Sequence, residues 1–262
     1  MKKTNFLLLS ALIFIVLISS AIIGVGAEGL SWYCAHTKDH KQPSIGHEFS
    51  FIDKYNGYYI DKCHNENCDE KVVYLTFDAG YENGNIARIL DTLKQENVPA
   101  AFFVLGNIIK KETHLIERMI TEGHTVCNHT YSHKDMTRCE TIEEFQEELR
   151  ILENAYYDCT GKEMAKYYRP PEGRFSEENL KFASELGYKT IFWSFAYADW
   201  DNNKQMSAEK AKDKILSNIH NGAVILLHPN SKTNADILAD VIKELKLQGY
   251  SFGTLDMLTQ KI

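Results

Sequence analysis

Residues 72–80 have the sequence Val-Val-Tyr-Leu-Thr-Phe-Asp-Ala-Gly, an apolar, β-rich run that ends in a carboxylate at Asp78. The run lacks the alternation of apolar and polar residues that is typical of a half-exposed strand. It therefore predicts a strand covered on both faces, as in a parallel sheet. An acid at the end of such a strand is costly unless it is paired or functional, so Asp78 is a candidate for chemistry.

Further β-type runs follow along the chain, and the stretches 86–93, 142–152 and 237–245 carry apolar side chains at helical spacing. Strands that alternate with helices predict a parallel sheet with crossover helices. We expect the α/β class and a distorted, incomplete (β/α)7 barrel, with an open doubly wound sheet as the alternative. No Gly-rich phosphate loop follows any run, which weighs against a nucleotide-binding sheet. The expected strands cover residues 72–77, 100–105, 124–128, 166–169, 189–195, 223–227 and 250–253.

The chain divides into three expected segments. Residues 1–27 begin with two lysines, continue with an apolar stretch and end in small residues, which predicts a cleaved signal peptide or a retained membrane anchor. In both cases the rest of the protein is expected to be exported, with contact to the membrane only through this segment. Residues 28–70 are polar and aromatic without a clear period, and we expect an irregular arm that packs on the main domain, residues 71–262.

Charge and cysteine content restrict the partners and the redox chemistry. The formal net charge is -7 and no basic run is interleaved with aromatic residues, so no nucleic-acid partner is expected. Six cysteines are present, and Cys63 and Cys68 are close enough in sequence to bridge, but the sequence does not assign pairs. A cysteine-bound zinc site would need a second matching pair, and the sequence has none.

Several side chains with catalytic chemistry stand just after expected strands. In a parallel α/β barrel such positions gather on one face, so we expect these residues to share a site. The candidate members of that site are Asp78, His129, His133, Arg169, Asp199, Trp200 and His228.

His129 and His133 are the candidate metal ligands. On a helical turn, residues four apart lie on one face, so both rings reach one ion. Zinc accepts imidazole nitrogen and keeps an open water position in catalytic sites. We expect one divalent ion, Zn²⁺, with Co²⁺ or Mn²⁺ as alternatives. The competing interpretation is a pair of surface histidines at the start of a helix.

The other polar candidates supply a base and an acid. Asp78, kept ionised by a metal or by Arg169, is expected to take a proton from water, whereas a helix N-cap is its alternative role. His228 is expected to protonate a leaving amine, because imidazole holds and releases a proton near neutral pH. Its alternative is a core histidine bonded to backbone. Asp199 is expected to orient His228, and Trp200 to form a pocket wall.

Together these motifs resemble the polysaccharide deacetylases of the NodB-homology type, carbohydrate esterase family 4, over roughly residues 71–258. The stretch 76–80, Thr-Phe-Asp-Ala-Gly, is similar to the family's first motif, Thr-Phe-Asp-Asp-Gly. The resemblance implies that Asp78 is the catalytic base. It also implies that His129 and His133, which form the family's His-x-x-x-His motif, bind the metal.

The later motifs of the family are matched in part. Arg169 and Pro171 match its Arg-x-Pro motif, which implies that the arginine tethers the base. The resemblance places an oxyanion donor at the backbone N–H of Glu172. Asp199-Trp200 partly matches the fourth motif, and His228 matches the acid of the fifth.

Two residues depart from the family pattern. Ala79 replaces the second aspartate of the first motif, which is a metal ligand in the family. The metal is therefore expected to bind more weakly, or Asp78, Glu82 or water takes the place of that ligand. Ala196 stands where many members carry an acid.

These two departures, together with the stretches 80–84, 169–176 and 192–197, resemble one branch of the family. That branch is the peptidoglycan N-acetylmuramic acid deacetylases, which prepare muramic δ-lactam in the cortex of bacterial spores. The resemblance implies a peptidoglycan glycan strand as substrate and a partner amidase that removes the peptide stem. Tyr81, in the first stretch, is a candidate substrate contact together with Trp200.

Two other functions stay open at this point. A non-catalytic glycan-binding module would explain Ala79, but binding alone does not need the acid and base set of Asp78 and His228. A deacetylase of chitin or xylan type would keep the chemistry and change the sugar.

Overall fold

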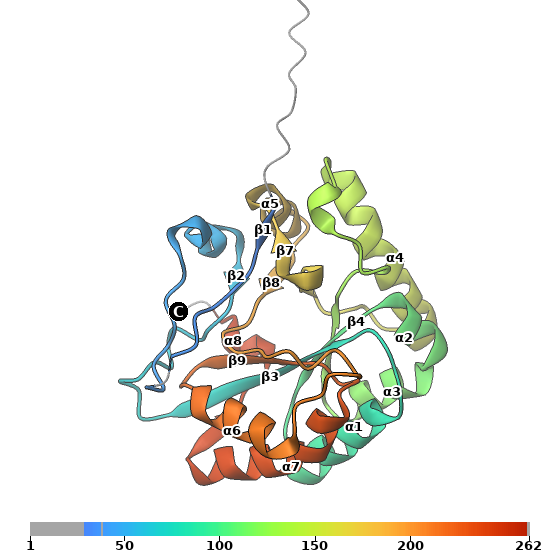
Figure 1. Cartoon of the computed structure of the whole chain (residues 1–262). Helices are drawn as coiled ribbons and strands as arrows, with labels where there is room; N and C mark the ends of the chain where they lie inside the picture. Colours follow the sequence, from blue (N-terminus) through green and yellow to red (C-terminus); the bar gives the residue numbers. More distant parts are fainter. Residues whose placement is uncertain (1–28, 38, 261–262) are drawn as a thin grey trace, which may run out of the picture.

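The computed structural model describes residues 29–37 and 39–260, so the segment expected to be a signal or an anchor lies outside the described residues (Figure 1). The central strand, β3 (Lys71–Ala79), pairs in parallel with β4 (Ala101–Val104) and with β9 (Ala223–Leu227). Within the part of the chain that the structure describes, no helix is both long and apolar enough to cross a bilayer.

The main sheet curls into a distorted barrel. Its strand order is β10-β3-β4-β5-β6-β8-β2, and β9 pairs with β3 off this path. A parallel bridge from Phe195 to Ile225 connects the stretch after β8 to β9, which brings the two ends of the curl together. The predicted barrel is confirmed, and the open sheet is wrong. The strands not yet introduced are β2 (Gly57–Tyr58), β5 (Thr125–Asn128), β6 (Tyr167–Tyr168), β8 (Lys189–Ile191) and β10 (Tyr250–Phe252).

Helices cover the outside of the barrel. Alternate residues of β3 face two different apolar clusters, one shared with the helices and one shared with other strands. Val73, Leu75 and Phe77 pack in one cluster with helix side chains, whereas Val72 and Tyr74 pack with the inner residues of other strands. Figure 1 shows α1, α6 and α7 together on one side of β3 and β9. The helices are α1 (Asn85–Glu96), α2 (Gly106–Lys111), α3 (Thr113–Thr121), α4 (Ile142–Thr160), α5 (Glu177–Glu185), α6 (Ala208–Asn218), α7 (Lys232–Leu247) and α8 (Leu255–Leu258).

Helix α4 illustrates how the sequence sets these bounds. The side chain of Thr141 accepts a hydrogen bond from the backbone N–H of Glu144, and the Glu144 carboxylate accepts one from Glu140, which together cap the first turn. Gly161 ends the helix in a left-handed conformation, with φ 67°, that a residue with a side chain rarely adopts.

The arm, residues 29–70, packs on the barrel in short pieces. Its first strand, β1 (Leu30–Ser31), pairs antiparallel with β7 (Arg174–Phe175), and β2 adds an eighth strand to the main sheet that the sequence did not predict. The 3₁₀ turns His47–Phe49 and Ile52–Tyr55 bury Phe49 and Ile52 in an aromatic cluster.

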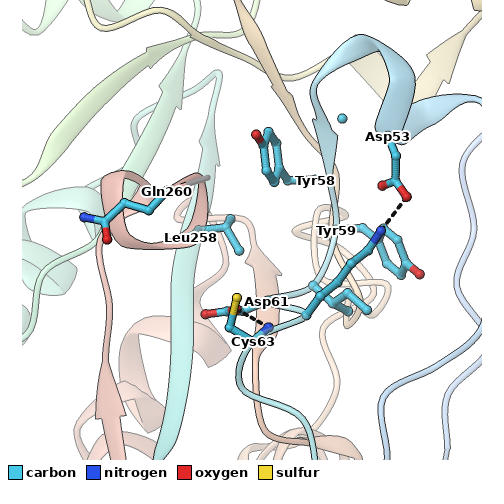
Figure 2. A pocket seen from close by; sticks show the side chains of 10 residues that line it. Asp53, Tyr58, Tyr59, Asp61, Cys63, Leu258 and Gln260 are labelled. Carbon is cyan, nitrogen blue, oxygen red and sulfur yellow. Dashed lines mark hydrogen bonds and ion pairs between the residues drawn. The ribbon is translucent and has the colours of Figure 1, made fainter. Parts of the chain in front are cut away.

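A cavity of about 390 Å³ lies between the arm and the C-terminal segment (Figure 2). Tyr58, Tyr59, Leu258 and Gln260 are among its lining residues. Asp61 in its wall accepts a hydrogen bond from the backbone N–H of Cys63. None of the predicted site residues lines this cavity. All six cysteines are free thiols, so no bridge joins Cys63 to Cys68 in this structure.

Candidate active site

The predicted site residues converge at the carboxyl ends of the strands. Asp78 is near the end of β3, and His129 and His228 directly follow β5 and β9. Two adjoining cavities, of about 260 and 570 Å³, share part of their lining there. The residues common to both cavities are Asp78, His129, His133, Trp200 and His228.

Arg169 is a fully buried cation that holds the Asp78 carboxylate. Its Nη1 donates to Asp78 Oδ1 at 2.7 Å, and its Nη2 donates to the Thr76 hydroxyl at 2.9 Å. Its Nε and Nη2 also donate to the backbone carbonyls of Ile191 and Phe192. Four acceptors therefore fix the guanidinium, as expected for a buried charge.

Asp78 is ionised despite its burial. Burial alone would raise the pKa of its carboxyl, but the positive charge of Arg169 with its hydrogen bond, and the charge of His228, lower that pKa overall. The N-cap of helix α1 is Gly84, and the Glu82 carboxylate accepts from the first turn at Ile86, so the alternative role of Asp78 as an N-cap is wrong.

We expect Arg169→Met to lower the free energy of unfolding by about 3–5 kcal/mol, because it leaves the Asp78 carboxylate buried without its partner. The matched control is Arg88→Met, which removes a surface pair to Asp236 with an N–O distance of 2.6 Å. Its side chains are 46% and 33% exposed, so this variant should lose less than about 1 kcal/mol. Urea unfolding followed by circular dichroism measures both. Equal losses would contradict a special role for the buried pair.

His129 presents an unprotonated nitrogen to Asp78. Its Nδ1 lies 2.9 Å from the carbonyl oxygen of Arg169, so Nδ1 carries the proton that it donates. Burial lowers the pKa of His129 to about 4, which keeps the ring neutral. Its Nε2 then faces Asp78 Oδ2 at 3.6 Å with a lone pair. Two acceptors that face each other in this way favour a cation between them.

The two histidines lie on a loop and not on the helical turn that the sequence predicts. The backbone has left-handed φ values of 69° at Thr130 and 60° at His133, and no helix forms between β5 and α4 except a short 3₁₀ turn after Asp135. The loop still brings the rings together, with centroids 5.1 Å apart.

The donor set fits a divalent ion, although it is not a complete site. A neutral, backbone-oriented imidazole is the usual form of a metal ligand, and His129 and His133 would hold the ion. Among residues 29–37 and 39–260, no three His, Cys, Asp or Glu side chains form a ready-made metal cluster. Ala79 is buried in the apolar cluster that contains Val73 and the helix side chains, and it offers no ligand atom. The carboxylate of Glu82 already accepts from the backbone of Gly84 and Ile86, so water or Asp78 must complete the coordination.

His228, which lines the same cavity, forms a second charged pair with the buried Asp199. His228 Nδ1 lies 2.7 Å from Asp199 Oδ1, and the other carboxylate oxygen accepts from the His228 backbone N–H and the Asn234 amide. Burial would lower the pKa of His228, but the hydrogen bond and charge of Asp199, followed by the charge of Asp78, raise it overall. The imidazole thus holds a proton more firmly than usual, and its alternative role as a backbone-bonded core histidine is wrong.

Glu172 stands in a sharp turn beside the larger cavity. Its φ of 56° and the φ of 65° at Gly173 make two successive left-handed residues, and the Gly173 N–H donates to the Pro170 carbonyl. The Glu172 side chain is exposed. Glu172 and Gly173 both line the larger cavity, so the backbone of this turn borders the charged groups.

The cavity walls include residues that were not predicted as members of the site. Trp193, Tyr197 and Leu226 line the larger cavity together with Ala196. Tyr81 lines the smaller one, and both Tyr81 and Trp200 are 59% exposed at the rim. The apolar wall residues lie within or next to expected strands, where an apolar side chain indicates core, so no signal in the sequence separates the two roles.

Comparisons with known proteins agree with this geometry. Residues 65–191 match the family model described as polysaccharide deacetylase. Peptidoglycan-N-acetylmuramic acid deacetylase PdaA of Bacillus subtilis is 42% identical over 232 residues, which cover 88% of this chain and 86% of that protein. The chain belongs to the polysaccharide deacetylase family. This confirms the predicted family and, with it, the expected class of enzyme, a hydrolase.

The solved structure of the same relative and one further member show how broad the likeness is. The structure of Bacillus subtilis PdaA, a family 4 carbohydrate esterase, superposes with a TM-score of 0.82 over 88% of this chain and 97% of that chain. Peptidoglycan-N-acetylglucosamine deacetylase PgdA of Listeria monocytogenes is 37% identical over 72% of this chain, but over only 39% of that protein. The likeness to PdaA thus extends over more of both chains.

Proposed function

We propose that the protein removes the N-acetyl group from N-acetylmuramic acid residues of peptidoglycan, giving acetate and a free sugar amine. The observation that carries this is the pairing, in one cavity, of an ionised Asp78 held by Arg169 with a proton-holding His228 held by Asp199. A base and an acid with pKa values pushed apart are what amide hydrolysis needs. Identity of 42% with an N-acetylmuramic acid deacetylase supports the sugar.

The residues divide the reaction between them. Asp78 takes a proton from the attacking water, and the Glu172 backbone N–H stabilises the charge that develops on the acetamide oxygen. His228 then gives its proton to the departing amine. When bound at His129 and His133, a divalent ion, which we propose to be Zn²⁺ with Co²⁺ or Mn²⁺ as alternatives, polarises the carbonyl and acidifies the water.

The rim of the cavity suits a glycan strand. Tyr81 and Trp200 expose aromatic faces beside the charged groups, and such rings pack against sugar rings while their polar tips stay in water. As part of the same proposal, the protein acts outside the cytoplasm on spore cortex, where deacetylation leads to muramic δ-lactam. A partner amidase first removes the peptide stem.

The test is acetate release from peptidoglycan glycan strands without peptide stems, after chelation and after Zn²⁺, Co²⁺ or Mn²⁺ is added back. We expect release only with metal, and mass spectrometry should locate the lost acetyl group on muramic acid. His129→Ala should lose the bound metal, measured by elemental analysis, whereas His114→Ala, whose side chain is 67% exposed, should keep it. No acetate with any metal would favour the glycan-binding module. Release from chitin or acetylxylan alone would favour the other sugars.

A further inference from the structure

Trp32 of the arm donates hydrogen bonds to two backbone segments that line the larger cavity of the active site. It is 5% exposed, and its indole Nε1 donates to the carbonyl of Trp193 at 2.9 Å. Its backbone N–H donates to the carbonyl of Gly173 at 2.8 Å, which continues the pairing of β1 with β7. These two carbonyls belong to segments far apart in the sequence, and Trp32 joins them.

The first of these segments is the turn that carries the Glu172 N–H. A Cβ atom added at Gly173 would lie 2.8 Å from the Trp193 ring and 3.2 Å from Trp32 Cβ, so the turn is held closely on both sides. Because Gly173 and Glu172 are both left-handed, the turn has little intrinsic preference for this conformation. Its direction therefore depends on the contacts made by Trp32 and Trp193.

The second segment holds Arg169. The ring of Trp32 stacks on that of Phe192, with centroids 4.4 Å apart and an interplanar angle of 25°. The Phe192 carbonyl accepts from Arg169 Nη2, and the guanidinium in turn bonds Asp78. Trp193, the next residue, lines the larger cavity. The arm thus contacts the backbone that places both the base and the cavity wall.

We propose that Trp32 is a positioning residue for deacetylation, which fixes the Glu172–Gly173 turn relative to the Phe192–Trp193 segment. This rests on the proposed function, because that function gives the turn and Asp78 their roles. Only Trp32 of its aromatic cluster donates to both segments: its neighbours Phe49 and Tyr59 have ring centroids 5.1 and 5.3 Å away and make no such hydrogen bond.

The experiment compares three full-length variants with the wild type. Trp32→Phe removes the N–H and some volume, and Trp32 replaced by 3-(3-benzothienyl)alanine removes only the N–H. Phe49→Leu removes ring volume from the same cluster and is the matched control. We expect kcat for acetate release to fall about tenfold in both Trp32 variants with KM within about twofold, because small displacements of a catalytic group are costly. Phe49→Leu should lose stability and keep kcat.

A second measurement does not depend on activity. Hydrogen exchange of the peptides 170–176 and 192–197 should speed up in both Trp32 variants and not in Phe49→Leu, with the β4 peptide 101–104 as internal reference. A benzothienyl variant with unchanged kcat and unchanged exchange would overturn the proposal. If the wild type releases no acetate, the proposed function fails by itself, and the exchange data still decide whether Trp32 holds the two segments.

Discussion

Asp78→Asn should lower kcat/KM for acetate release by about 10³-fold, within the range of general-base contributions. The amide keeps the size of the carboxylate and an oxygen that accepts from Arg169, whose three other acceptors remain, so the cavity should keep its shape while the fold loses the stabilisation of the paired charge. It cannot take a proton from water. The same change removes the negative charge beside His129 Nε2, so the affinity for a divalent ion should fall as well. Steady-state kinetics at saturating metal separate the loss of the base from the loss of the ion.

The matched control is Asp236→Asn, which neutralises a carboxylate that pairs with Arg88 and Lys232 on the surface. It should leave kcat/KM within about twofold, since exposed pairs contribute little. Retention of most activity by Asp78→Asn at saturating metal would show that another group is the base, and the assignment of the Asp78–Arg169 pair would be wrong.

The fold was largely predictable because strands covered on both faces have a strong apolar signal. The expected strand 223–227 is found with the same bounds in β9. The expected strand 189–195 ends at Ile191, because the carbonyls of Phe192 and Trp193 accept from Arg169 and Trp32 and not from a neighbouring strand. The arm strand β2 has two residues, too few for any period to show.

The site was predictable where chemistry and position coincide. Asp78, His129 and His228 end strands or directly follow them, so their convergence follows from the barrel itself. The geometry between His129 and His133 was not predictable, since the loop depends on a positive φ at Thr130, and a β-branched residue rarely adopts that conformation. Trp32 was equally out of reach, because a tryptophan in an irregular segment indicates burial but not what it bonds.

The second large effect concerns the pH dependence of the acid. His228 works in its protonated form, so kcat/KM should fall as the pH rises through the His228 pKa. Asp199 raises that pKa above the ordinary value by its hydrogen bond and its charge. Asp199→Asn removes the charge, lowers the pKa of the imidazole, and should move the basic limb of the profile to lower pH. Compared with the wild type, the variant should therefore lose more activity at high pH, where its imidazole has lost the proton, than at low pH, where both imidazoles are protonated.

His228→Gln provides the limiting case of the same prediction. It removes the proton donor, so kcat/KM should fall by about 10²–10³-fold, and the basic limb that belongs to the imidazole should disappear. Substrates with a better leaving group need less protonation, so an activated aryl acetate should be hydrolysed by this variant with a much smaller loss than the sugar amide. An equal loss on both substrates would mean that His228 shapes the cavity and does not donate the proton, because a purely structural defect does not depend on the basicity of the leaving group.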